Sequence, residues 1–122
     1  MTITLDHTIV PAHDRQDAAR WFAEVFGLPQ EEKSGHFAPV RVNETLTLLF
    51  SDAAAFDAHH YAFHVGDLEF DAIFDRVKQK GVVFGSAPWS RDDGKLNDWG
   101  GGRGVYFESP DGHLMELMTA RQ

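Results

Sequence analysis

The stretch "HHYAFHV" places three of the seven histidines of the chain at positions 59, 60 and 64. Imidazole nitrogens are common ligands for transition metals, and they also exchange protons near neutral pH. Because side chains alternate between the two faces of a strand, His60 and His64 share one face. His59 belongs to the other face and lies just before the strand. On this pattern alone, a metal site, a packed strand and an exposed cluster all stay open.

Two further residues could complete a metal site. His7 opens an apolar run in the same way as His60, so the two imidazoles can converge if the runs are related strands. Glu116 lies inside the apolar run "HLMELMT", where it must be paired or metal-bound unless it faces water from an edge strand. Two histidines and one carboxylate form a facial triad that leaves open positions for water, substrate or dioxygen.

The ligand types limit which metals fit but do not choose among them. The chain contains no cysteine, so disulfides and thiolate sites are excluded. Nitrogen and oxygen ligands of this kind suit one divalent ion of Fe, Mn, Ni, Co or Zn.

The elements that must position these residues occur twice along the chain. Placing His7 over His60 aligns two segments in which an apolar strand, an aspartate and an amphipathic helix follow one another. The aspartates, Asp14 and Asp67, are predicted N-caps. Strand-like runs then follow: "HFAPVRV" and "TLTLLF" in the first half, and "GVVFGS", "GVYFES" and "HLMELMT" in the second. We expect one domain over 1–122, with a module of about 1–52 and another of about 58–120.

A long loop, "APWSRDDGKLNDWGGGRG", precedes the run that starts at residue 104. Such a loop is either a flexible surface segment or a lid over a cavity. Trp89 and Trp99 could stack on an aromatic ligand or simply anchor the loop. Arg103 is a candidate for binding an anionic group of the substrate. His36, near the start of an earlier strand, either reaches the cavity or faces solvent.

Composition and charge exclude several classes of protein. A chain of 122 residues with 43% hydrophobic residues can bury a core and does not resemble a disordered segment. No apolar run approaches a membrane span and the N-terminus lacks a signal-peptide pattern, so we expect a cytoplasmic protein with no membrane partner. The formal net charge of −8, without a basic cluster, argues against nucleic acid as a partner.

Three motifs, in order, resemble the vicinal oxygen chelate superfamily of paired βαβββ modules. "LDHTIV" is similar to its first strand, which carries a ligand histidine, here His7. "HYAF" is similar to the strand that opens the second module with a ligand histidine, here His60. "YFESPDGHLMEL" is similar to its end pattern of an aromatic strand, a turn and a ligand glutamate, here Glu116, with Ser109 replacing the first Asp of the turn. The resemblance covers nearly the whole chain and implies a metal on these three ligands.

The resemblance also implies the architecture and the groups around the metal. The expected fold is α+β, with the paired modules forming a half-open mixed β-sheet barrel around a metal and ligand cavity. The superfamily implies a homodimer, with His7 contributed within one subunit or across the interface. Tyr106, at the family's spacing before Glu116, implies a substrate contact through its phenol. His64 either assists substrate binding and proton transfer in the cavity or packs at its rim.

Three differences from the family's patterns argue against three of its known activities. Glyoxalase I has a fourth ligand, a glutamate in the last strand of the first module, where this chain has Leu48 or Leu49. Extradiol dioxygenases need a histidine from the strand before the second-module ligand, and none occurs between Pro39 and Ala58. Fosfomycin-resistance enzymes carry a basic extension after the ligand glutamate, which is not found here. The chain therefore lacks at least one expected feature of each of these three activities.

Two hypotheses of different classes follow. The first is a mononuclear metalloenzyme that acts on a small substrate with two neighbouring oxygens, by dioxygenase, lyase, isomerase or transferase-like chemistry. The second is a metal-free protein of the bleomycin-resistance type, which sequesters an aromatic antibiotic among Trp and Phe side chains. The complete ligand set favours the first, and metal content separates the two.

Overall fold

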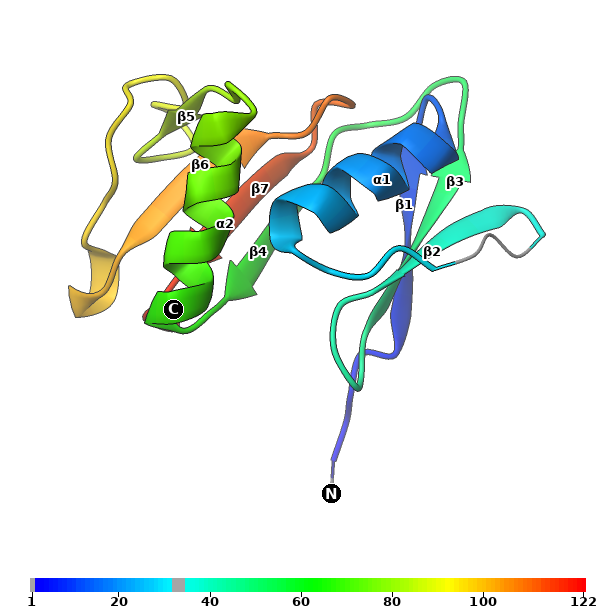
Figure 1. Ribbon diagram of the computed structural model, residues 1–122, viewed down its shortest axis with the longest axis horizontal. Coiled ribbons are helices and arrows are strands. Elements are labelled where there is room, and N and C mark those ends of the chain that lie inside the picture. Colours follow the sequence, from blue (N-terminus) through cyan, green and yellow to red (C-terminus); the bar gives the residue numbers. More distant parts are fainter. Residues whose placement is uncertain (1, 32–34) are drawn as a thin grey trace. The chain divides into compact units, whose positions relative to one another are not determined.

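The computed structural model describes residues 2–31 and 35–122 of the chain. The chain divides into two compact units, Met1–Asp57 and Ala58–Gln122, which are called here the N-terminal and C-terminal modules. Each module contains one long helix and one mixed sheet, as Figure 1 shows. The boundary lies between the two expected modules, and their union into one domain stays a prediction.

The N-terminal module begins with a parallel strand pair. Strands β1 and β3 are parallel, β2 is antiparallel to β3, and the order in the sheet is β1-β3-β2. The elements are β1 (His7–Ala12), α1 (Arg15–Phe26), β2 (Phe37–Arg41) and β3 (Thr47–Asp52). Asp14 caps α1 by accepting a hydrogen bond from the amide of Asp17, as predicted. Gly27 ends the helix with a left-handed φ of 70°.

The C-terminal module repeats this pairing with one more strand. Strand β4 is parallel to β7, β6 is antiparallel to β7, and β5 extends the edge, so the order is β4-β7-β6-β5. The elements are β4 (His60–His64), α2 (Asp67–Gln79), β5 (Phe84–Gly85), the short 3-10 helix η1 (Trp99–Gly101), β6 (Gly104–Glu108) and β7 (Leu114–Met118). The predicted repeat and the α+β class are confirmed. The run "GVVFGS" forms only the two-residue β5.

The predicted helical stripes are core. Helix α1 buries Phe22 and Val25 completely, and the ring of Phe22 stacks on Phe26 at 4.1 Å between centroids. Helix α2 buries Phe70 and Val77 completely. Burial of large apolar side chains on one face of each helix is the main source of its stability. Among the described residues, no helix is long and apolar enough to cross a bilayer.

The start of α2 differs from the prediction by one residue. Gly66 is the N-cap and Asp67 is the first helical residue. The amide of Gly66 donates a hydrogen bond of 3.1 Å to the carboxylate of Glu69, which completes half of a capping box. Asp67 as N-cap is therefore wrong, because Glu69 provides the local contact and the Asp67 carboxylate binds Arg103 instead.

The register of the C-terminal sheet separates two faces. Tyr106 pairs with Glu116 and with Gly85, and Glu116 pairs with Ala62, so these positions share one face. The opposite face carries Val105 and Phe107, both fully buried. This second face meets α2, because Phe84, the register partner of Phe107, lies edge-to-face on Phe74 at 4.9 Å between centroids. The face with Tyr106, here called the site face, is the one away from α2.

Candidate metal centre

His60 and Glu116 meet on the site face of the C-terminal module. His60 pairs with Leu114, and Glu116 lies two residues farther along β7 on the same face. The Nε2 atom of His60 is 2.9 Å from Oε1 of Glu116. The His60 side chain is 46% exposed and that of Glu116 only 5%. The buried carboxylate of Glu116 is therefore in contact with an imidazole, that of His60, which is accessible to solvent.

The second oxygen of Glu116 has no hydrogen-bond donor. Its Oε2 atom is buried and without a partner among the described residues. A buried polar atom left unsatisfied costs about 1–3 kcal/mol, and an ion that is not present is one of the few explanations for such an atom. The alternative of an exposed edge strand is wrong, because β7 lies between β4 and β6. The donor set of Glu116 and His60 fits a divalent cation.

Tyr106 adjoins this pair. It is the direct cross-strand partner of Glu116, is 2% exposed, and its ring lies 5.8 Å from that of His60. Burial raises the pKa of Tyr106 well above its ordinary value, and the hydrogen bond and charge of the Glu116 carboxylate raise it further. The phenol therefore keeps its proton and can act as a hydrogen-bond donor at neutral and moderately alkaline pH.

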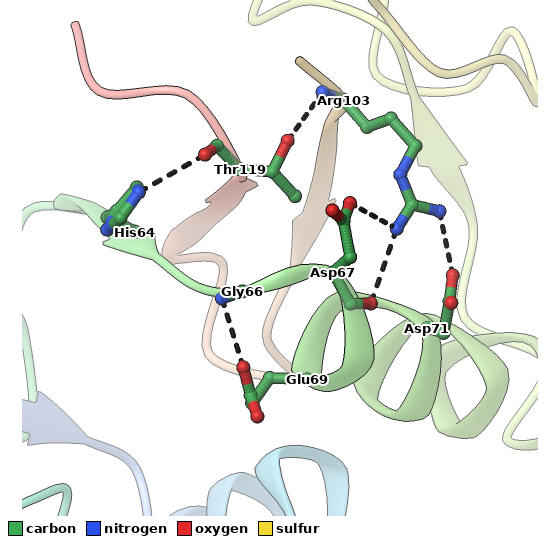
Figure 2. A network of polar contacts seen from close by, with 7 residues as sticks. All are labelled: His64, Gly66, Asp67, Glu69, Asp71, Arg103 and Thr119. Carbon is green, nitrogen blue, oxygen red and sulfur yellow. Dashed lines mark hydrogen bonds and ion pairs between the residues drawn. The ribbon is translucent and has the colours of Figure 1, made fainter.

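His64 shares the site face but turns away from Glu116. The register pairs it with Met118, and its ring N–H donates to the carbonyl oxygen of Thr119, with an Nε2–O distance of 3.2 Å. Figure 2 shows this contact. The side chain is exposed. Strand parity made His60 and His64 equivalent, whereas the structure pairs only His60 with the carboxylate.

In the N-terminal module, His7 opens β1 as His60 opens β4. Its Nδ1–H donates to Asp6 at 2.8 Å, and its side chain is 58% exposed. A carboxylate on Nδ1 fixes the tautomer and leaves the Nε2 lone pair for a metal, as in many histidine ligands. The hydrogen bond to Asp6 is compatible with the predicted role of His7, which stays a prediction.

The strand register also identifies the residue of the N-terminal module that corresponds to Glu116. His60 pairs with Leu114 two residues before Glu116, and His7 pairs with Thr47 two residues before Leu49. Leu49, rather than Leu48, is therefore the counterpart of the buried acid. The N-terminal module has no fourth carboxylate ligand at this position. Within the described residues, no group of three or more His, Asp or Glu side chains is close enough to hold a metal.

Two tryptophans of the loop before β6, Trp99 and Trp89, form a row of aromatic rings next to Tyr106. The ring of Trp99 lies at 5.9 Å from Tyr106, and that of Trp89 lies at 6.0 Å from Trp99. Trp99 is half-buried, whereas Trp89 is 80% exposed. The exposure of the rings therefore increases from Tyr106 on the site face to Trp99 and then to Trp89.

Backbone contacts hold this loop in place. Asn97 and Gly104 exchange two backbone hydrogen bonds of 2.9 and 3.0 Å, and the Asn97 side chain donates to the carbonyl of Ser86. At Gly85, a Cβ atom would stand only 1.9 Å from the carbonyl oxygen of Ser90. The loop therefore passes directly over the edge strand, and only glycine fits beneath it.

Arg103 is held by α2. Its two terminal nitrogens donate to Asp71 at 2.7 Å and to Asp67 at 3.0 Å, and the guanidinium stands 4.4 Å from the ring centroid of Phe70. Figure 2 shows both ion pairs. An anionic substrate would have to compete with two carboxylates for this guanidinium. His36, a further substrate-binding candidate, lies exposed in the turn before β2.

One buried histidine escaped the sequence analysis. His113 is 1% exposed, and its Nδ1 accepts a hydrogen bond of 3.0 Å from the amide of His59. The amide of Leu114 in turn donates to the carbonyl of His59 at 2.8 Å. These bonds clamp the residue before His60 to the start of the strand that carries Glu116. The sequence feature that could have indicated its burial is its position directly before the apolar strand β7. A polar side chain that is buried at such a position needs a hydrogen-bond partner.

The chain has relatives over nearly its full length. A model of the Glyoxalase/Bleomycin resistance protein/Dioxygenase superfamily matches residues 4–117. The solved structure of "Oxidase ChaP-H2" is 40% identical, with a TM-score of 0.93 over 100% of this chain and 96% of that one. "Glutathione transferase FosA" of Serratia marcescens is 27% identical over 96% of this chain and 81% of that protein. "Metallothiol transferase FosB" of Lysinibacillus sphaericus (strain C3-41) is 25% identical over 98% of this chain and 84% of that protein.

Proposed function

The chain belongs to the Glyoxalase/Bleomycin resistance protein/Dioxygenase superfamily, also called the vicinal oxygen chelate superfamily, and we propose that it is a metal-dependent oxidase. Its substrate would be a small molecule that presents two neighbouring oxygens. Oxidation is preferred over lyase or transferase chemistry because the similarity to the oxidase is higher and spans the whole chain. The observation that carries a metal-dependent function is the buried Oε2 of Glu116 beside His60, which has no hydrogen-bond partner among the described residues.

A divalent metal would be held by His60 and Glu116, with His7 as the proposed third ligand. His7 holds the same register position in its module as His60 does in the other. When bound, such an ion supplies Lewis acidity for the two substrate oxygens and open positions for dioxygen. Nitrogen and oxygen donors of this type do not select one ion among Fe, Mn, Ni, Co and Zn.

The residues around these ligands would bind and orient the substrate. Tyr106 stays protonated, so its phenol can donate a hydrogen bond to a substrate oxygen. His64 is exposed on the same face and is the proposed proton-transfer residue. Trp99, half-buried and edge-on to Tyr106, is proposed to stack on a ring of the substrate, with Trp89 beyond it. Arg103 is a weaker substrate-binding candidate because two aspartates already bind its guanidinium, and His36 is weaker because its side chain is exposed.

Metal content tests the proposal. Protein purified without an affinity tag should carry about one divalent metal per chain by elemental analysis, and His60→Ala and Glu116→Gln should each lose it. His59→Ala is the matched control, because His59 adjoins His60 but precedes the strand and belongs to its other face. Oxygen uptake is then measured with a panel of catechols, hydroxyquinones and 2-hydroxy ketones. Full metal retention by both ligand variants would overturn the site.

The second candidate function is a metal-free binding protein for an aromatic antibiotic. The exposed ring of Trp89 beside Trp99 is the observation that favours it. Quenching of tryptophan fluorescence by an aromatic antibiotic, with the same affinity before and after chelation of metal, would support this function. An effect of the ligand variants on binding would argue for the oxidase instead. The expected homodimer is measured in the same samples by light scattering.

A further inference from the structure

The C-terminal module contains a second candidate site, a cavity beside the loop that follows β5. Its volume is about 420 Å³, which lies within the range of small-ligand sites. None of the residues that line it is a proposed metal ligand, and all of them belong to this one compact unit. The lining includes the apolar residues Val83, Pro88 and Trp89 and the charged residues Arg91, Asp92 and Glu108.

Trp89 is the large aromatic side chain of this cavity, and it is 80% exposed. A ring that stays in solvent gains little from burial, so packing does not explain it. The turn from Ala87 to Ser90 holds Trp89 in place, because the amide of Ser90 donates to the carbonyl of Ala87 at 3.0 Å. Pro88 occupies the second position of this turn, where its fixed φ favours the bend. The fold therefore keeps an uncovered indole ring at the cavity.

The loop around the cavity is closed by its own hydrogen bonds. The Asp93 carboxylate accepts from the amides of Ser86 and Lys95, both at 3.0 Å. The amide of Gly94 donates to the carbonyl of Phe84 at 3.0 Å, which ties the loop to β5. Because these contacts already order the loop, a ligand that binds here does not have to supply the ordering free energy.

The charges of the lining favour a cation. The Nε atom of Arg91 donates to the carbonyl of Pro88 at 2.6 Å, and a terminal nitrogen lies 3.6 Å from the Glu108 carboxylate. Asp92 is exposed and has no ion-pair partner in the part of the chain that the structure describes. With Arg91 offset by Glu108, the Asp92 carboxylate leaves a negative charge at the cavity. The formal net charge of −8 adds a field of the same sign.

An indole face and a carboxylate together recognise an organic cation. Tryptophan is the strongest partner for a cation among the aromatic side chains. Among the described residues, Lys78 stands over Phe74 and Arg103 over Phe70, whereas none of the protein's own cations stands over Trp89. A methylated ammonium group fits such a place, because its charge is attracted to the ring while its methyl groups contact apolar walls and need no hydrogen-bond acceptor.

We propose that this cavity binds a small organic cation that carries a methylated ammonium group. The cation lies on the indole ring of Trp89, the methyl groups contact Val83 and Pro88, and Asp92 supplies the opposite charge. The site requires no metal and does not rest on the proposed oxidase function. It adds a second ligand site to the chain, apart from His60 and Glu116.

Three probes of nearly the same shape and of different charge test the proposal on the full chain. Choline is the cation, 3,3-dimethylbutan-1-ol is its neutral analogue, and 3,3-dimethylbutanoate is the anion. Nuclear magnetic resonance titrations follow the indole N–H peak of Trp89 and the backbone amides of Val83 and Asp92. Choline should bind roughly fivefold or more tightly than the alcohol, the ratio that a cation–π contact of this exposure supplies. Added salt should weaken only the binding of choline.

Two variants identify the groups that recognise the charge. Trp89→Leu keeps an apolar side chain without the π face, so its affinity for choline should fall to about that of the alcohol. Asp92→Asn should weaken choline about threefold, as expected for one exposed opposite charge, and should leave the alcohol unchanged. Asp98→Asn is the matched control, because Asp98 is an exposed aspartate of the same loop that does not line the cavity. It should bind choline like the parent.

The outcomes against the proposal are equally specific. Equal affinity for choline and the alcohol, or an unchanged affinity for choline in Trp89→Leu, would overturn the cation site. Tighter binding of the anion than of choline would assign the cavity to Arg91 instead and would also overturn it. The indole peaks of Trp21 and Trp99 report that each variant is folded. Failure of the oxidase proposal appears separately, as absence of bound metal, and leaves these titrations unaffected.

Discussion

His60 Nε2 lies 2.9 Å from Glu116 Oε1, while the other oxygen of the same carboxylate is buried and has no donor in the part of the chain that the structure describes. The imidazole is the hydrogen-bond partner of one carboxylate oxygen, and its own side chain is 46% exposed while that of Glu116 is 5% exposed. We propose that a cation binds between these two side chains, and metal ligands must be deprotonated to bind. The proposed metal binding should therefore depend on pH and should stabilise the fold.

Glu116→Gln should separate the two effects of this carboxylate. The amide keeps an acceptor for His60, so the metal-free variant should unfold within about 1 kcal/mol of the parent. Metal should no longer stabilise it, whereas the parent gains about 2.7 kcal/mol at a metal concentration of 100 Kd. Thermal denaturation with and without metal measures both. Glu108→Gln, at an exposed carboxylate on the same sheet face, is the control and should respond to metal like the parent.

The ultraviolet titration of tyrosine should be shifted for the whole chain. Tyr61 and Tyr106 are the only tyrosines, and the pKa of each is raised, by burial in Tyr61 and by burial and Glu116 in Tyr106. At pH 10 a model tyrosine is about half ionised, whereas the folded chain should show less phenolate absorbance than the unfolded chain. Equal phenolate absorbance of the folded and unfolded chains at this pH would contradict the raised pKa values of the two phenols.

The same shifts determine the sign of the pH dependence of stability. The folded state holds the phenolic protons more tightly than the unfolded chain does, so unfolding releases protons above the unfolded pKa of about 10. The stabilisation is complete below that pH and is lost as the pH rises through the higher folded pKa values. The free energy of unfolding from urea titrations should therefore fall above about pH 10. Tyr106→Phe should reduce this slope.

His113 should matter for stability and for the geometry of His60. His113→Leu removes the acceptor for the amide of His59 and should cost about 1–3 kcal/mol in urea unfolding. His113→Asn can place a side-chain oxygen near the lost Nδ1 and should recover part of the stability and of the metal affinity. Equal losses in the two variants would contradict a role for the hydrogen bond. His36→Ala, at an exposed turn, should stay within about 0.5 kcal/mol of the parent.

Arg103→Gln tests whether the guanidinium fastens the glycine-rich end of the loop to α2. The ion pairs to Asp67 and Asp71 are partly exposed, so their loss should cost about 1 kcal/mol, and less at high salt. The fluorescence of Trp99 should change as the loop end loosens. A large fall in substrate affinity with unchanged stability would instead assign Arg103 to the substrate.

The repeated strand, helix and strand order could be predicted from the sequence because periodicity and caps are local signals. The apolar stripes of Phe22 and Phe70 lie in the core as expected, and the motifs around His60 and Glu116 indicated the superfamily correctly. The N-cap of α2 is Gly66 and not Asp67, because Glu69 accepts from the Gly66 amide and the Asp67 carboxylate binds the distant Arg103. The choice between Leu48 and Leu49 needed the register, which a short apolar strand does not specify.

The sequence by itself determined the α+β modules, the family and which residue types could bind a metal. Only the tertiary structure decided that His60 binds the Glu116 carboxylate while His64 turns to Thr119. It also decided that Arg103 is engaged by two aspartates and that His113 is buried against His59. Parity and periodicity report which face a side chain occupies. Its partner depends on strand register, rotamer and contacts with residues far away in the chain, which only the folded packing brings together.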